Sequence, residues 1–105
     1  MAEIINALTG WDITDWDMMK VGERGLNLAR AFNVREGFTK ADDVFPKRAH
    51  QAFTSGPIAG VGYGEDRLSE AVSSYYDMIG WDRETGFPRR AKLQELDIEW
   101  VADLL

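Results

Sequence analysis

The sequence predicts an all-α protein, a small irregular bundle of about four helices joined by a long glycine-rich connection. Two segments carry apolar residues three and four positions apart, which is the spacing of an amphipathic helix. No segment shows the alternation of a strand with one wet face. The 105 residues, 45% of them hydrophobic, suit a single helical domain that covers residues 1–105 and holds a modest core.

The first predicted helix covers Ala2–Leu8, and Gly10 ends it in the left-handed conformation that favours glycine. A second clear helix covers about Asp66–Ile79, and Gly80 ends it in the same way. A tryptophan and an aspartate follow each glycine. We interpret the two Gly-Trp-Asp strings as one helix-stop arrangement used twice.

The longest predicted helix lies between these two, from about Asp15 to either Asn33 or Gly37. Thr14 is its expected N-cap, and Asp17 three residues later stands where a capping box needs an acceptor. This segment is the longest that is predicted to form one regular element, and it holds the largest number of distinctive sequence motifs. The rest of the chain is therefore expected to be organised around it.

This longest helix has one apolar side and one polar side. The apolar side is expected to be buried and comprises Met18, Val21, Leu28 and Phe32, with Met19, Leu26 and Ala29 on the neighbouring row. The wet side comprises Lys20, Glu23, Arg24, Asn27 and Arg30. Gly22 and Gly25 fall on the apolar side, where each costs the helix about 1 kcal/mol relative to alanine. They indicate either a close crossing of another backbone or a kink. The expected partner in the bundle is the helix Asp66–Ile79.

The remaining segments connect and close the bundle. Phe38–Ala49 is a polar connection in which Pro46 forbids continuous helix. Gln51–Gly64 is rich in glycine but is interleaved with large apolar residues, which favours an ordered loop. Pro88 begins a short helix, and the apolar tail from Ile98 onward is expected to dock on the bundle.

Composition excludes several classes of function. The formal net charge of −6 argues against nucleic acid as a partner, because little in the chain would neutralise phosphates. The absence of cysteine excludes disulfides, thiolate metal sites, iron–sulfur ligation and a cysteine nucleophile within this chain. The sequence has no apolar run long enough for a membrane span and no signal-peptide pattern. A soluble, cytoplasmic protein without a membrane partner is expected.

The motifs that suggest chemistry do not build a site. The string Gly60–Gly64 precedes a helix, but Glu65–Asp66 would repel a phosphate at that helix end. The acidic residues lack the spacing of a calcium loop. His50 is the only histidine and has no nucleophile or second ligand nearby, and Asp42–Asp43 is most simply a solvated turn. We therefore expect no catalytic, cofactor-binding or metal-binding residue in this chain.

One short segment at the end of the longest helix is a candidate contact site. Two phenylalanines flank a charged Arg-Glu pair there, and the candidate contact residues are Asn33, Arg35, Glu36 and Phe38. Arg35 could cap carbonyl groups at the helix end, where a positive charge is favoured. The segment is either an internal clamp or a contact that reaches another domain.

These strings together resemble the C-terminal region of the tungsten-containing aldehyde:ferredoxin oxidoreductases. The resemblance covers nearly the whole chain and rests on strings in a fixed order: Thr9-Gly10-Trp11-Asp12, Gly22-Glu23-Arg24, Asn27-Leu28, Phe32 to Phe38, Asp42-Asp43, Pro46-Lys47-Arg48, Tyr75-Tyr76, Gly80-Trp81-Asp82 and Gly86-Phe87-Pro88. It implies the all-α fold of that C-terminal domain.

The resemblance also implies a much longer parent enzyme. Such enzymes hold tungsten on two pterin dithiolenes beside a [4Fe–4S] cluster, and they oxidise aldehydes to carboxylates with electrons passed to ferredoxin. Their cofactor and catalytic residues lie upstream of the matched region, so the resemblance carries none of them onto this chain. The 105 residues alone are expected to be inactive and to bind no cofactor.

Two functions are compatible with this resemblance. The first is a structural C-terminal part of such an oxidoreductase, with the remaining domains as its partner and ferredoxin as the partner of the whole enzyme. The second is a free-standing helical interaction or dimerisation module that descends from the family. In either case the isolated chain is expected to self-associate, with Phe53, Ile58 or Phe38 at the contact.

Overall fold

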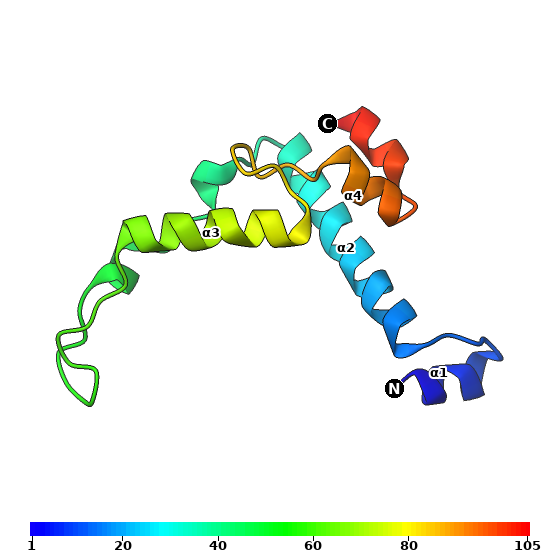
Figure 1. Ribbon diagram of the computed structural model, residues 1–105, viewed down its shortest axis with the longest axis horizontal. Helices are drawn as coiled ribbons and strands as arrows, with labels where there is room; N and C mark the ends of the chain where they lie inside the picture. The colour runs from blue at the N-terminus through cyan, green and yellow to red at the C-terminus, as the bar shows by residue number, and fades with distance from the viewer.

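The computed structural model describes all residues from Met1 to Leu105. Its four α-helices are α1 (Ala2–Thr9), α2 (Asp15–Arg35), α3 (Glu65–Ile79) and α4 (Arg90–Glu95). Three short 3-10 helices complete it: η1 (Lys40–Asp42), η2 (Lys47–His50) and η3 (Glu99–Leu104). The only strand-like feature is an isolated bridge between Trp81 and Pro88. The all-α prediction is confirmed (Figure 1).

The predicted caps at Thr14, Gly10 and Gly80 are confirmed, whereas α2 ends at Arg35, between the two predicted ends Asn33 and Gly37. The Thr14 hydroxyl accepts a hydrogen bond from the Asp17 amide, and the Asp17 carboxylate accepts one from the Thr14 amide, which completes the capping box. Gly10 and Gly80 end α1 and α3 in the left-handed conformation, at φ of 75° and 83°. Local chemistry therefore defines where these helices begin and end.

The buried side of α2 is the opposite of the predicted one. Asn27 is fully buried and Arg30 is 7% exposed, whereas Val21 and Phe32 on the apolar side are more than half exposed. The polar side is covered because Trp81, the turn at Gly86 and the chain after α4 supply partners for its hydrogen-bonding groups. Periodicity separated the two sides correctly, but their burial depends on what packs against them.

The hydrophobic core lies where α4 and η3 fold onto the C-terminal half of α2. The core cluster comprises Ala31, Leu93, Leu96, Ile98 and Val101. The predicted docking of the C-terminal tail is confirmed for Ile98 and Val101, whereas Trp100 and Leu104 of the same tail remain exposed. This core is small, because one turn of α2 and two short helices build it.

A network of charges attaches α4 to the N-terminal half of α2. Lys20 and Lys92 each pair with both Glu23 and Glu95, at nitrogen–oxygen distances of 2.5 to 2.9 Å. These hydrogen bonds lower the pKa of Glu95 to about 2. Arg24 also donates from Nε to the carbonyl oxygen of Leu96 at 2.7 Å. Residues predicted to face water thus hold two helices together.

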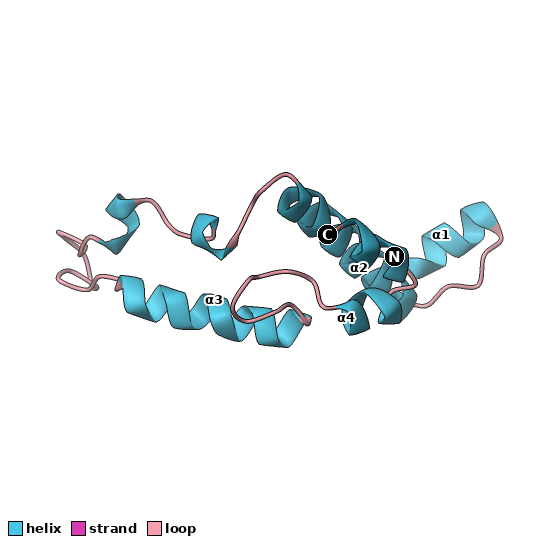
Figure 2. Ribbon diagram, turned by 90° about the horizontal axis from the view of Figure 1, so that it is seen from above, coloured by secondary structure: helices cyan, strands magenta, loops and turns pink.

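The prediction that α2 packs centrally against α3 along their apolar stripes is wrong. In Figures 1 and 2, α3 runs away from α2 and approaches it only near its C-terminal end. Tyr76 of α3 contacts Arg30 on the polar side of α2, where Trp81 and the turn at Gly86 also pack. The other side of α2 is left open.

The predicted close crossing at Gly22 and Gly25 is absent from this chain. A Cβ atom at either position would meet nothing within 4 Å. The helix cost of about 1 kcal/mol per glycine is therefore not explained by any contact of these 105 residues.

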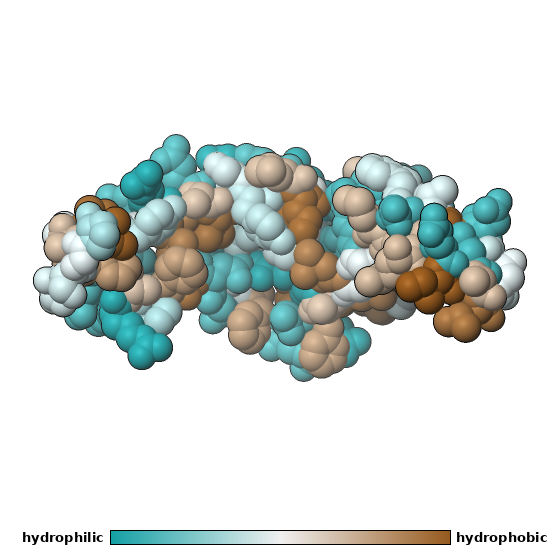
Figure 3. All heavy atoms as spheres, turned by 90° about the horizontal axis from the view of Figure 1, so that it is seen from below, coloured by the Kyte–Doolittle hydropathy of each residue, from teal (hydrophilic) through white to brown (hydrophobic).

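The molecule is far more extended than its length requires. Its Cα radius of gyration is 18.3 Å, with principal extents of 54, 35 and 20 Å. A compact domain of this length has a radius of gyration of about 13 Å. Only 15 of the 105 residues are buried, and Figure 3 shows apolar side chains at the surface in several places. None of the helices combines the length and the apolar character that crossing a bilayer requires.

Candidate functional site

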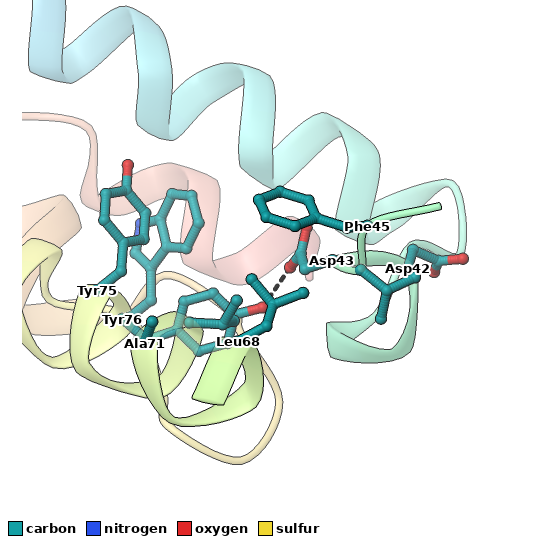
Figure 4. Close-up of a pocket in the computed structure, with 10 residues that line it drawn as sticks. Asp42, Asp43, Phe45, Leu68, Ala71, Tyr75 and Tyr76 are labelled. Carbon is teal, nitrogen blue, oxygen red and sulfur yellow. Dashed lines mark hydrogen bonds between the residues drawn. The ribbon is translucent and has the colours of Figure 1, made fainter. Parts of the chain in front are cut away.

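Three elements meet at a buried polar junction that consists of Arg30, Asp43 and Tyr76. Arg30 of α2 binds the Asp43 carboxylate with both terminal nitrogens, at 3.0 Å from Nη1 to Oδ1 and 2.6 Å from Nη2 to Oδ2. The Tyr76 hydroxyl of α3 donates to the same carboxylate (Figure 4). A bidentate pair of this kind fixes distance and orientation together. The junction therefore connects α2, the residue after η1, and α3.

A second layer of contacts holds the arginine in place. Its Nε donates to the carbonyl oxygen of Gly86 at 3.0 Å, and its guanidinium lies 4.7 Å from the ring centre of Trp81. The Trp81 indole nitrogen donates to Oδ1 of Asn27 at 2.9 Å. All the buried side-chain nitrogen and oxygen atoms have hydrogen-bond partners. These hydrogen bonds compensate the desolvation cost of burying the polar groups.

Gly86 is required where the turn passes over the junction. Its φ is 73°, and a Cβ atom there would lie 2.5 Å from Nη2 of Arg30 and 2.9 Å from the Tyr76 hydroxyl. A larger residue would displace the arginine from its carboxylate.

The junction keeps its protonation state across the physiological range. Burial alone would raise the pKa of Asp43, but the hydrogen bonds from Arg30 and Tyr76 outweigh burial and lower that pKa. Burial and the hydrogen bond to Asp43 raise the pKa of Tyr76 to about 12. At neutral pH the aspartate is charged and the tyrosine is neutral, so the three side chains act as a structural joint and do not exchange protons.

The sequence interpretation missed this junction. Asp43 was expected in a solvated turn and Arg30 on the wet side of α2, and both expectations are wrong. Asp42 does remain exposed, where it accepts a hydrogen bond from the Thr39 amide at 2.8 Å. A signal was available, because the family strings contain every residue of the junction and its second layer except Arg30: Asn27, Asp43, Tyr76, Trp81 and Gly86.

An apolar cleft of about 480 Å³ lies beside the junction, between α3 and the segment after η1. Its lining comprises Asp42, Asp43, Val44, Phe45, Leu68, Ala71, Val72, Tyr75, Tyr76 and Trp81. Figure 4 shows Phe45 and Leu68 on its two sides, with Asp43 and Tyr76 joined across it. Much of the apolar stripe predicted for the second clear helix therefore lines this cleft and does not face α2.

The predicted contact residues lie at the surface, at the C-terminal end of α2. Arg35 pairs with Glu36 at 3.2 Å, both side chains are half exposed, and the guanidinium lies 5.5 Å from the ring centre of Phe32. Phe38 is half exposed, and Asn33 is exposed as well. The hydrogen bonds between the Arg35 and Glu36 side chains join neighbouring residues, and Arg35 also lines a hollow with residues of η3. The contact to another domain stays a prediction.

The other residues considered as functional candidates, His50 and the glycine-rich loop, take part in hydrogen bonds within the chain. His50 Nδ1 lies 2.6 Å from the carbonyl oxygen of Tyr63, and the glycine-rich loop closes on itself through hydrogen bonds between Phe53 and both Gly60 and Val61. No three His, Asp or Glu side chains gather where they could hold a metal ion. The chain has no cysteine for a [4Fe–4S] cluster. These residues therefore do not fit an iron–sulfur cluster, which needs thiolate ligands.

The fold and the junction thus define a helical structural module, and comparison with known proteins gives its family. A model described as "Aldehyde ferredoxin oxidoreductase, domains 2 & 3" matches residues 1–98. The tungsten-containing aldehyde ferredoxin oxidoreductase of Pyrococcus furiosus is 39% identical over 98 residues, which are 91% of this chain and 16% of that protein. The proteins of the same name from Thermococcus kodakarensis and Pyrococcus abyssi are 37% and 35% identical, with 91% and 92% of this chain and 16% of each relative covered.

The chain belongs to the aldehyde ferredoxin oxidoreductase family. It spans 16% of the length of these relatives, and the match falls within the region of domains 2 and 3.

Proposed function

We propose that this chain is the C-terminal structural part of a cytoplasmic tungstopterin-dependent aldehyde:ferredoxin oxidoreductase. In the whole enzyme an aldehyde is oxidised to a carboxylate and the electrons pass to ferredoxin. The 105 residues form a helical wall against the domains that hold tungstopterin and the [4Fe–4S] cluster, and they supply neither cofactor ligands nor catalytic groups. Family membership and the absence of fitting ligands in this chain support the assignment.

The observation that carries the proposal is the open shape of the molecule. A radius of gyration of 18.3 Å leaves a large share of the apolar residues at the surface. Monomeric proteins rarely expose contiguous apolar patches beyond a few hundred Å². A chain that wraps part of a larger body explains both the extended shape and the exposed apolar residues.

We propose that the contact residues Asn33, Arg35, Glu36 and Phe38 belong to the surface that this larger body covers. The Arg35 and Glu36 side chains are about half exposed, and their polar groups hydrogen-bond to each other, so they could pair again with groups of another domain.

A chimeric enzyme tests the proposed function directly. The whole chain, with η3 included, would replace the matched segment of the Pyrococcus furiosus relative, and the purified chimera would be assayed for tungsten content and aldehyde-dependent reduction of ferredoxin. We expect a folded, tungsten-containing enzyme that is active. The matched control is the relative with the same segment deleted, which should lose tungsten because the wall around the cofactor is missing.

A chimera that folds but holds no tungsten would contradict the proposal and would favour a free-standing interaction module. Reading the coding sequence next to this one gives an independent check, since the proposal requires cysteine and pterin-binding segments in the same or an adjacent chain.

A further inference from the structure

The open side of α2 carries a continuous uncharged seam. Its members are Met18, Val21, Gly25, Leu28 and Phe32, which follow one another at intervals of three, four, three and four residues. Gly22 and Ala29 lie directly beside them on the helix surface. This interval is the 3.5-residue spacing with which one helix packs along another. We call these seven residues the α2 seam.

Most of the α2 seam is uncovered within the chain, and η3 reaches only its C-terminal end. Val21 is 61% exposed and Phe32 is 58% exposed, while α4 pairs with Glu23 on the polar side of the helix. The seam continues into a hollow of about 120 Å³ between α2 and η3, where Leu28 and Phe32 meet the exposed residues Trp100, Leu104 and Leu105. The exposed part of the C-terminal tail therefore extends the same apolar surface.

We propose that the α2 seam receives a helix from the part of the oxidoreductase that lies outside these 105 residues. This inference rests on the proposed function. The incoming helix runs nearly along α2, because packing with a 3.5-residue period corresponds to a crossing angle of about 20°. Its backbone approaches most closely at Gly22 and Gly25, where no side chain separates the two helices, and Trp100 and Leu104 cover its flank.

The remainder of the enzyme fits the seam better than a second copy of this chain does. The matched relatives hold 84% of their length outside the region covered here (100% minus 16%), and the extended fold lacks the body around which it wraps. A second copy would bring together two chains of formal charge −6, a repulsion that salt screens within about 8 Å.

A matched pair of charge substitutions in the chimera tests the α2 seam. Val21→Glu places a carboxylate on the seam, and Met19→Glu places one two residues away, off the seam, at a similar exposure of 66% against 61%. An unpaired charge buried against an apolar helix is strongly unfavourable, so we expect Val21→Glu to lower the tungsten content at least about tenfold. Met19→Glu should retain most of the tungsten, and Phe32→Glu should lower the tungsten content as Val21→Glu does.

Two further measurements separate loss of docking from loss of folding. In the isolated chain neither position is covered, so Val21→Glu and Met19→Glu should have the same helix content and thermal midpoint. Amide hydrogen exchange along α2 should be slower in the chimera than in the isolated chain, and Val21→Glu should remove that protection.

The outcomes distinguish the two proposals. If the chimera contains tungsten and Val21→Glu and Met19→Glu have the same effect on it, the proposal that a helix docks on the α2 seam is wrong, and the proposed function is unaffected. A chimera that never contains tungsten overturns both. An isolated chain that forms a stable dimer, which Val21→Glu alone dissolves, assigns the seam to a second copy and overturns the proposal.

Discussion

At the residue scale, the buried arginine of α2 defines how this chain holds itself together. Arg30 is 7% exposed, yet both terminal nitrogens pair with one carboxylate and Nε has a carbonyl partner. A buried charge is tolerated only when its partners are complete. Removing any one of them therefore affects three elements, because Asp43, Tyr76 and Gly86 come from different parts of the chain.

Replacing Asp43 with alanine should destabilise the chain by about 3 kcal/mol, since it leaves the Arg30 guanidinium buried without a counter-ion. The measurement is urea unfolding followed by circular dichroism. Asp77→Ala is the matched control, because it removes an aspartate that pairs with Arg83 at the surface. That exposed pair should contribute no more than about 1 kcal/mol. Equal losses for both variants would contradict the structural role of the junction.

Tyr76 should make stability sensitive to alkaline pH. Its pKa rises from the ordinary value of 10.0 to about 12 on folding, so its contribution is fully present below pH 10. Between pH 10 and 12 the unfolded chain releases the proton and the folded chain keeps it, which lowers the free energy of unfolding by up to about 1.4 kcal/mol per pH unit.

Unfolding curves for the wild type and Tyr76→Phe at pH 8, 10 and 12 check this dependence. The difference in stability between the two proteins should shrink as pH rises through that window. A difference that stays constant would show that the hydroxyl is not held by Asp43.

At the element scale, α2 has two sides with different tasks. Its polar side binds the rest of this chain, and its apolar side is free. Side-chain periodicity distinguishes the two sides, but the pairing of Asn27 with Trp81 and of Arg24 with Leu96 decides which is covered.

Gly25→Ala should stabilise the isolated chain by about 1 kcal/mol, because the new Cβ meets nothing within 4 Å and the helix gains propensity. The thermal midpoint should rise by about 4–8 °C. In the assembled chimera the same substitution should cost about 1–3 kcal/mol by overpacking the crossing helix. Gly86→Ala is the contrasting control and should destabilise both forms, since its Cβ would clash with Arg30. If Gly25→Ala raised the stability of both the isolated chain and the chimera, a close helix crossing at Gly25 would be contradicted.

At the scale of the whole molecule, the extended shape governs behaviour in solution. With 15 of 105 residues buried, most of the apolar surface of the isolated chain faces water. The net charge of −6 opposes association only weakly at physiological salt, where screening acts over about 8 Å.

The isolated chain should therefore self-associate with increasing concentration, as sedimentation velocity would measure. Phe53, Ile58 and Phe38 are about half exposed, and replacing each with serine should weaken the association. Val44→Ser, at another exposed apolar position, is the control. A strictly monomeric chain at millimolar concentration would contradict the prediction.

The sequence by itself determined what depends on neighbours along the chain. The capping box at Thr14, the left-handed glycines at positions 10 and 80, and the helices between them follow from local backbone chemistry. The order of the family strings was also sufficient to identify the family.

Only the tertiary structure decided which groups meet across the chain. Arg30 and Asp43 are 13 residues apart, and Arg30 and Gly86 are 56 apart, so no periodicity connects them. Sequence periodicity predicts that a charged side chain is exposed, although a distant partner can compensate its burial. It predicts that an apolar side chain is buried, even when nothing in the chain covers it. For this protein both predictions failed on α2: Arg30 is buried because its partners lie within the chain, and the apolar side is exposed because the helix proposed to cover it lies outside these 105 residues.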